Sequence, residues 1–421
     1  MRRLLHATGR SDFARVAHQR PLPALMRLSA ACLTLCSLTL AAPASLAGGE
    51  PAWSLNGFAN LGVARSSFDD ARYRYVPTAD AEIGTAPSPR IDSLAGVQLR
   101  YEHSDTLHFT AQLLAREAPV EGAPLIVNWA YLGWQASDRT EIKLGRIMLP
   151  FFMFSDTRHV RYAQPWVRPP AEVYSLVANN ENHDGAYLRN LMPVGAWTCV
   201  TELFVGMSDD RNRNTSLSNT AYGVALSAYD AHWTVRLMWL DGTTKIDSPL
   251  LGSVLSMLQQ RAPDVAADYA YEKLEHTGYH TFGVRYEDDQ WLLLGEVAGT
   301  RTGGSRMLGD DVGAYLTVGR RFGAWQPYLG YAWRRSNDLD PDARITDPVA
   351  ARVTAQLLAA QNYSQDTATL GLRWDLALNF ALKAQFDRVT PRDGARGSFT
   401  QALPAGRRYS DVLSVAANLI F

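Results

Sequence analysis

The stretch TATLGLRWDL (residues 367–376) alternates apolar and polar side chains with a strict period of two. Its apolar members share one face of an extended chain: Ala368, Leu370, Leu372, Trp374 and Leu376. The residues between them are Thr, Thr, Gly, Arg and Asp. Because successive side chains of a strand point to opposite faces, this stretch predicts a strand with one apolar and one polar face.

The same period recurs along the chain, for example in residues 279–287 and in residues 380–387. In all, the pattern predicts sixteen strands: 53–66, 92–104, 106–117, 127–137, 140–150, 183–192, 196–208, 219–230, 232–243, 275–288, 290–301, 311–322, 325–336, 366–377, 379–390 and 410–421. Segments of 10–14 residues suit tilted strands that cross a bilayer, since such strands need roughly 9–11 residues.

The connections between these strands alternate in length. Tight turns, such as Ser104-Asp105 and Asp138-Arg139, follow the even-numbered strands. Long loops follow the odd-numbered ones: 67–91, 118–126, 151–182, 209–218, 244–274, 302–310, 337–365 and 391–409. This alternation predicts an all-β fold, a transmembrane antiparallel β-barrel of about sixteen strands with long external loops and short periplasmic turns.

The last segment, 410–421, ends in SVAANLIF with Phe421 as the final residue. Its apolar face is expected to meet lipid rather than a protein core. Hydrocarbon tolerates no open sheet edge, so its backbone is expected to pair with the first strand, near Trp53. Polar start signals at Ser248-Pro249 and Asp347-Pro348 predict a short helix in each of two long loops.

A terminal strand that ends in Phe resembles the general porins of Gram-negative outer membranes, as does the KLGR stretch (Lys143–Arg146) before the third long loop. The resemblance extends over residues 48–421, which are expected to form a single barrel. It implies a homotrimer in the outer membrane, surrounded by lipid and lipopolysaccharide. It also implies that the third long loop folds back into the lumen.

The N-terminal residues 1–47 read as a signal peptide: Arg27 precedes an apolar run from Ala30 to Ala42, and a small-residue cleavage site ends at Ala47. Met26 is a possible true start. Outside this region no run of 18 apolar residues occurs, which argues against a helical membrane protein. The formal net charge of −1 shows no basic excess, so no nucleic-acid partner is expected.

Residues 151–182 are the candidate constriction of the lumen. Their charged side chains are mostly basic: Arg158, His159, Arg161 and Arg168 against Asp156 and Glu172. A ring of arginines in a pore favours anions. The alternative is a loop packed over the rim, with its arginines in salt bridges.

The inward faces of the strands are also predicted to be mostly basic. Alternation assigns eight basic residues to the lumen wall: Arg100, Arg116, Arg189, Arg236, Arg285, Arg334, Arg373 and Lys383. Four acidic residues face them: Glu102, Glu202, Glu296 and Asp387. Charges are costly on a lipid-facing surface, which supports the inward assignment.

These features predict a passive diffusion channel for small hydrophilic solutes or ions, with mild anion preference and no enzyme activity, metal or cofactor. A substrate-selective channel and a plugged structural or adhesive barrel remain open. So does an enzymatic barrel, in which Asn182-His183-Asp184 would supply a His–carboxylate pair.

Overall fold

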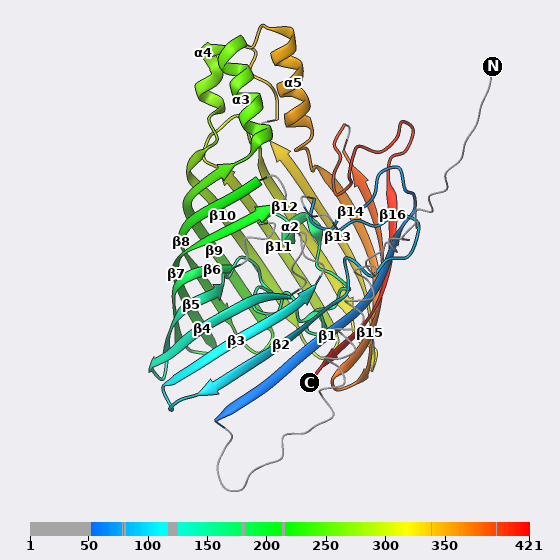
Figure 1. The fold of residues 1–421 in the computed structure, drawn as a ribbon. Coiled ribbons are helices and arrows are strands. Elements are labelled where there is room, and N and C mark those ends of the chain that lie inside the picture. The colour runs from blue at the N-terminus through cyan, green and yellow to red at the C-terminus, as the bar shows by residue number, and fades with distance from the viewer. Residues whose placement is uncertain are drawn as a thin grey trace, which may run out of the picture.

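The computed structural model describes residues 52–77, 79, 81–116, 125–177, 182–212, 215–337, 339–392 and 394–421. The predicted signal peptide, 1–47, lies outside them. Within the described residues the chain forms one closed barrel of sixteen antiparallel strands, each paired with its neighbours in sequence (Figure 1). The predicted fold class is confirmed.

The strands are β1 (Trp53–Ser66), β2 (Leu94–Glu102), β3 (Leu107–Arg116), β4 (Leu125–Ser137), β5 (Thr140–Met148), β6 (Asn182–Val194), β7 (Trp197–Asn212), β8 (Thr215–Tyr229), β9 (Trp233–Asp247), β10 (Lys273–Glu287), β11 (Trp291–Thr302), β12 (Asp310–Arg320), β13 (Trp325–Asn337), β14 (Gln365–Ala377), β15 (Phe380–Pro391) and β16 (Ser410–Ile420). The helical segments are η2 (Arg161–Ala163), α2 (Ala171–Tyr174), α3 (Pro249–Arg261), α4 (Pro263–Ala266), η3 (Ala267–Tyr269) and α5 (Pro348–Ala359).

The barrel closes by pairing β1 with β16 in the register Phe58↔Ile420 to Ser66↔Val412. This leaves no open edge in the hydrocarbon region. The closing contact begins at Gly57, which exchanges backbone hydrogen bonds with Phe421 at 2.9 and 3.0 Å, rather than at Trp53, which pairs only with Tyr101 of β2.

The strands β7 to β10 extend beyond the predicted ones at the loop end. The pairing of β7 with β8 continues to Asn212↔Thr215, so most of the predicted loop 209–218 is a strand hairpin. Residues 209–218 are polar or charged apart from Leu217. The backbone ladder needs no apolar face once the strands leave the membrane, which is why alternation of hydropathy did not reveal the extension.

The outer surface of the barrel is apolar, and much of the inner surface is buried. Exposed side chains such as Leu61, Val205, Leu316 and Leu370 lie on outward-facing strand positions. Aromatic residues gather at the short-turn ends of the strands, where Trp325 and Trp374 stack with ring centroids 4.4 Å apart. An apolar band with an aromatic girdle is the surface expected of a barrel in lipid.

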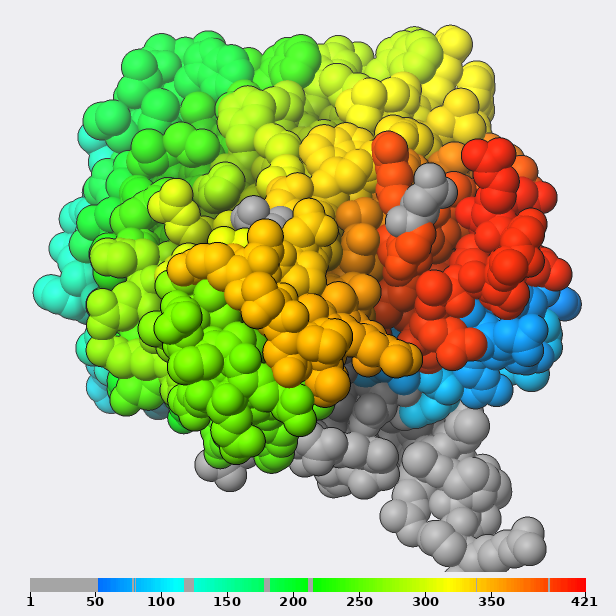
Figure 2. Space-filling model, turned by 90° about the horizontal axis from the view of Figure 1, so that it is seen from above, coloured from blue at the N-terminus to red at the C-terminus, as the bar shows by residue number. Residues whose placement is uncertain are grey.

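The two predicted loop helices are present, as α3 and α5. The side chain of Ser248 caps α3, and that of Asp347 caps α5 by accepting from the N–H groups of Val349 and Ala350. These helices and α4 stand together over one side of the loop end (Figures 1 and 2). Among the described helices, none has the length and apolar character needed to cross a membrane.

Candidate pore and its inner loop

Residues 149–177, called the inner loop below, lie inside the barrel together with η2 and α2 (Figure 1). Nearly all of their side chains are buried or half-buried, and only Asp156 and Ala163 are exposed. The loop reaches down to the short-turn end, where the Tyr162 hydroxyl donates to the carbonyl of Leu378 at 2.7 Å. The inner loop therefore spans most of the height of the lumen. The remaining residues of the predicted constriction, 178–181, lie outside the described residues.

Aromatic packing fixes the inner loop to the wall of β10 to β12. Phe152 stacks on Tyr174 with ring centroids 4.3 Å apart, and Phe151 meets Tyr279 of β10 edge-on at 5.1 Å. Trp166 packs edge-on against Tyr315 of β12 at 5.5 Å. Burying each such ring contributes about 1.5–3 kcal/mol, so the barrel interior here is a packed core.

Basic wall residues hold the backbone of the inner loop. The Lys383 ammonium on β15 donates to the carbonyls of Arg161, Gln164 and Trp166 at 2.6, 2.6 and 3.0 Å. The guanidinium of Arg373 on β14 donates to the Gln164 carbonyl at 3.0 Å. Two cations predicted to line the lumen thus serve as hydrogen-bond donors to the loop.

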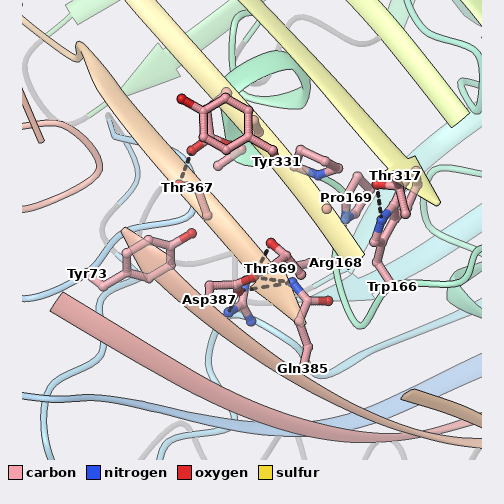
Figure 3. A pocket seen from close by; sticks show the side chains of 15 residues that line it. Tyr73, Trp166, Arg168, Pro169, Thr317, Tyr331, Thr367, Thr369, Gln385 and Asp387 are labelled. Carbon is pink, nitrogen blue, oxygen red and sulfur yellow. Dashed lines mark hydrogen bonds and ion pairs between the residues drawn. The ribbon is translucent and has the colours of Figure 1, made fainter. Parts of the chain in front are cut away.

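Arg168 is the buried ionic anchor of the inner loop. Its Nη1 donates to Asp92 at 2.7 Å and to Ser414 of β16 at 2.9 Å, and its Nη2 donates to Asp387 of β15 at 3.2 Å. Figure 3 shows this guanidinium beside Asp387 and Gln385. The side chain is only 2% exposed. Removing one partner of a buried ion pair typically costs 3–5 kcal/mol.

Glu172, in α2, is the buried acid of the inner loop. Its carboxylate accepts hydrogen bonds from Gln365 and Thr367 of β14, and the side chain is 2% exposed. No ion pair joins it to a described cation. Burial raises the pKa of the Glu172 carboxyl above its ordinary value, and the two hydrogen bonds oppose this shift only in part.

The other predicted constriction residues are also turned into the protein. Arg158 donates to the Tyr174 carbonyl at 2.8 Å and lies 5.1 Å from the Phe152 ring. His159 is 4% exposed and Arg161 is 6% exposed. The sequence led us to expect these side chains to face open solvent in the channel; the structure instead buries them, and of the six candidates only Asp156 is exposed.

The wall of β4 to β6 differs, because its inward side chains are partly open. The Lys143 ammonium lies 5.0 and 5.4 Å from the ring centroids of Tyr131 and Tyr187, and 3.4 Å from Glu141. Arg189 is half-exposed and has no ion pair with any described residue. Asp156 of the inner loop lies within electrostatic range of the Tyr187 hydroxyl. The inward face of this wall thus carries charges of both signs.

The predicted wall cations therefore fall into two groups. Those that contact the inner loop or its flanks are Arg236, Arg334, Arg373 and Lys383. Those with partly exposed side chains are Arg100, Arg116, Arg189 and Arg285. Within the second group Arg100 pairs with Glu102, and Arg285 with Glu287. The first group lies mainly on β13 to β15, and the second has three of its four members on β2, β3 and β6.

Two small spaces lie directly beside the inner loop. A cavity of about 20 Å³, room for about one water molecule, separates the inner loop from β12 to β15 (Figure 3). A larger space of about 190 Å³ lies at the short-turn end and is lined by Arg285, Arg321 and Arg373, with Glu287 as its acidic member.

Sequence reasoning missed Lys143, Glu141 and Asp92. The first two share the inward face of β5 and could have been assigned by the alternation in Glu141–Gly145. Asp92 lies in a loop and contacts Arg168 across 76 residues, so no local pattern could have paired them.

The residues considered for an enzymatic site do not form a catalytic pair. Asp184 points to the exterior of the barrel and is bidentate to Arg146, with both contacts at 2.8 Å. His183 is on the opposite face of β6 and is buried. Adjacent residues of one strand cannot meet in the lumen, and the two side chains are not hydrogen-bonded to each other.

No protein-family model and no curated protein matches the chain. Solved structures do match. The outer membrane channel DcaP of Acinetobacter baumannii is 12% identical with a TM-score of 0.53, and the match covers 89% of this chain and 100% of that one. The anion-selective porin from Comamonas acidovorans is 14% identical with a TM-score of 0.52, over 88% and 99% of the two chains. OmpF of Salmonella typhi, in complex with daunomycin, is 12% identical with a TM-score of 0.50, over 88% and 97%.

Identity this low establishes a common fold and nothing finer. The closed ring of sixteen antiparallel strands and these three matches agree. The predicted resemblance to porins is confirmed at that level: the chain has the closed-barrel fold of the outer-membrane porins.

Proposed function

We propose that the protein is an outer-membrane porin of a Gram-negative bacterium that lets small hydrophilic solutes diffuse passively, with a mild preference for anions. One observation carries the proposal. The inner loop packs against β10 to β16 and, through Val160, against Phe58, Leu94 and Leu114 of β1 to β3. The inward side chains Arg100, Lys143 and Arg189 of β2, β5 and β6 nevertheless stay partly open.

Selection would then depend on size and on the electric field across the gap. Asp156 on the inner loop opposes Lys143 and Arg189 on the wall, and the apolar barrel around them focuses this field. Over β2 to β6 and the inner loop, four partly open cations, Arg100, Arg116, Lys143 and Arg189, face three acids, Glu102, Glu141 and Asp156, and this small excess favours anions. The buried Arg158, Arg161 and Arg168 act as anchors of the loop in this proposal, and their role as pore lining is withdrawn.

The surroundings of the barrel belong to the same proposal. An apolar band with an aromatic girdle fits outer-membrane lipid and lipopolysaccharide. Homotrimers are expected by analogy with other porins.

Single-channel recording in a planar bilayer under a KCl gradient tests the proposal. The purified barrel should give stable conductance steps with a reversal potential on the chloride side. The double substitution Lys143→Glu/Arg189→Glu should move it to the potassium side. Arg146→Glu, which changes a cation on the exterior of the same wall, should leave it in place. A folded barrel that shows no conductance would contradict the proposal.

The dense packing of the inner loop favours a second candidate, a plugged barrel with a structural or adhesive role. Such a barrel would be silent as the wild type and would conduct only after the loop is released. Recording Arg168→Met beside the wild type separates the two. Steps in both proteins support the porin, and steps in the variant alone support the plug.

A further inference from the structure

The short-turn pocket is the space of about 190 Å³ at the short-turn end of the lumen. The inner loop supplies one wall through Phe154 and residues 162–165, and β10 to β14 supply the other. Ala163 is exposed, and the side chains of Arg285 and Arg321 are 40% and 36% exposed, so solvent reaches the pocket. No described residue of β2 to β6 lines it, so it is separate from the proposed diffusion path.

One side of the short-turn pocket is cationic. Arg285 comes from β10, Arg373 from β14, and Arg321 from the turn after β12. Glu287 pairs with Arg285. Asp375 lies 2.7 Å from Arg373 and 3.2 Å from Arg321. Three cations therefore share two acids, and the group keeps one positive charge in excess.

The described hydrogen bonds use few of the donors of Arg285 and Arg321. A guanidinium has five N–H groups. The bond from Arg321 to Asp375 uses Nη1, and the bond from Arg285 to its glutamate uses Nη2. Arg373 is held more firmly, since its Nη1 donates to inner-loop carbonyls and its guanidinium lies 4.8 Å from the Tyr162 ring. Arg321 and Arg285 are therefore the cations best placed to bind a further anion.

The other side of the short-turn pocket is apolar. Leu292 and Leu294 point inward from β11 and are 4% and 1% exposed. Phe154 and Pro165 of the inner loop are buried and border the pocket with them. An inorganic anion would contact the cationic side alone, whereas a ligand with an apolar body would contact both sides. Cavities of about 150 Å³ hold a benzene ring, so this pocket has room for one ring and an acidic group.

We propose that the short-turn pocket binds a small organic carboxylate whose apolar body is about the size of one aromatic ring. The carboxylate pairs with the guanidinium fork of Arg321, with Arg285 beside it. Its single negative charge balances the excess charge of the arginines, and its ring lies against Leu292 and Leu294. The inference depends on the proposed function only for the side of the membrane that the pocket faces, which is the periplasm.

A ligand in this position joins the inner loop to the barrel wall. It contacts Phe154 and Pro165 on the loop and Leu292 and Leu294 on β11. A ligand that binds only the folded arrangement stabilises it by mass action. Saturating benzoate should therefore slow trypsin cutting of the inner loop at Arg161, next to the pocket.

Isothermal titration of the purified full-length barrel in detergent micelles tests the site, with benzoate, acetate, benzyl alcohol and inorganic phosphate as separate probes. Benzoate should bind more tightly than acetate, which lacks the ring, and than benzyl alcohol, which lacks the charge. Arg321→Gln should weaken the apparent Kd of benzoate about tenfold, as expected for the loss of one charge-assisted hydrogen-bonded pair.

The matched control is Arg320→Gln. It removes the neighbouring cation, whose guanidinium lies 5.0 Å from the Trp291 ring and 5.2 Å from the Phe322 ring, and it should bind benzoate as the wild type does. Arg321→Gln leaves Asp375 paired with Arg373, so the variant should keep its fold and its urea midpoint.

Equal binding of benzoate and acetate would overturn the site, because charge alone would then explain it. Equal binding of benzoate and benzyl alcohol, or unchanged binding of benzoate by Arg321→Gln, would overturn it as well. Tighter binding of inorganic phosphate than of benzoate would show a free-phosphate site instead. Conductance measured on the same preparation separates the two proposals: a barrel that conducts without binding benzoate contradicts only the pocket, and one that binds without conducting contradicts only the channel.

Discussion

The two halves of the lumen use the same kind of residue in opposite ways. On β15, Lys383 is 3% exposed and is enclosed by three carbonyls of the inner loop. On β5, Lys143 lies half-buried between two aromatic rings and faces the remaining space. Where the loop lies against the wall, an inward lysine donates hydrogen bonds that hold the loop. Where the loop leaves the wall open, the charge of an inward lysine contributes to the electrostatic potential of the lumen. The path of the loop decides between these roles.

Removing the charge of Arg168 should destabilise the half of the lumen filled by the inner loop more than any other substitution considered below. Arg168→Met leaves Asp92 and Asp387 buried without their cation, and we expect a loss of about 3–5 kcal/mol in the free energy of unfolding. Urea titration of the folded barrel measures it. Asp92→Asn/Asp387→Asn in the same chain should restore part of the loss. A loss no larger than that of Arg189→Met, in the open half, would contradict the anchor role.

Lys383→Met should have the next largest effect. It removes the donor from three buried carbonyls, at an expected cost of about 2–3 kcal/mol. The loosened inner loop should then be cut by trypsin at Arg158 or Arg161 faster than in the wild type. Lys143→Met is the matched control and should leave the cutting rate unchanged. Equal cutting rates for Lys383→Met and Lys143→Met would contradict the different roles assigned to these two lysines.

Glu172→Gln should give a smaller gain in stability. Burial raises the pKa of Glu172 in the folded protein, so the folded state binds its proton more tightly than the unfolded state does. This contribution is complete below the unfolded pKa and is lost as pH rises through the folded pKa. The variant should be more stable than the wild type at pH 8 and equal to it near pH 4. Urea midpoints at pH 8 and pH 4 measure this difference. Asp156→Asn, which changes an exposed acid, is the control and should show no such dependence on pH.

Asp156→Asn should have the smallest effect and should appear only in the open half. Removing the exposed acid of the inner loop should raise the chloride-to-potassium permeability ratio about twofold, as expected for a solvent-exposed charge. Reversal potentials at 0.1 M and 1 M KCl measure it, and the effect should fade at the higher salt. An unchanged ratio at low salt would place the conducting path away from Asp156.

The sequence was sufficient for the fold because the barrel is repetitive. Alternation of apolar and polar residues predicts each strand, as in residues 367–376. The alternation of long and short connections predicts which end of the barrel each strand runs towards. The course of the inner loop could not be read in this way. Its position depends on contacts such as Arg168 with Asp92 and Tyr174 with Glu296, which join residues 76 and 122 positions apart.

The charges of the inner loop were identified correctly, but their exposure was not. A basic loop next to a barrel can present its cations to solvent or exchange them for wall carboxylates, and composition is the same in both cases. The acidic wall residues Glu296 and Asp387 were the available signal, since acids buried in a wall need donors. They were assigned to an open lumen, whereas they bind Tyr174 and Arg168.

The helices α3 and α5 share one apolar core with residues from three separate loops, including Leu258, Met307, Ile345 and Ala350. Surface loops that are tied together in this way cannot be exchanged one at a time. A peptide copied from any single loop lacks the partners that shape it, so antibodies raised against such a peptide would miss the intact protein. Recognition of this surface by an antibody would depend on the assembled shape, and escape from it would require coordinated substitutions in several loops.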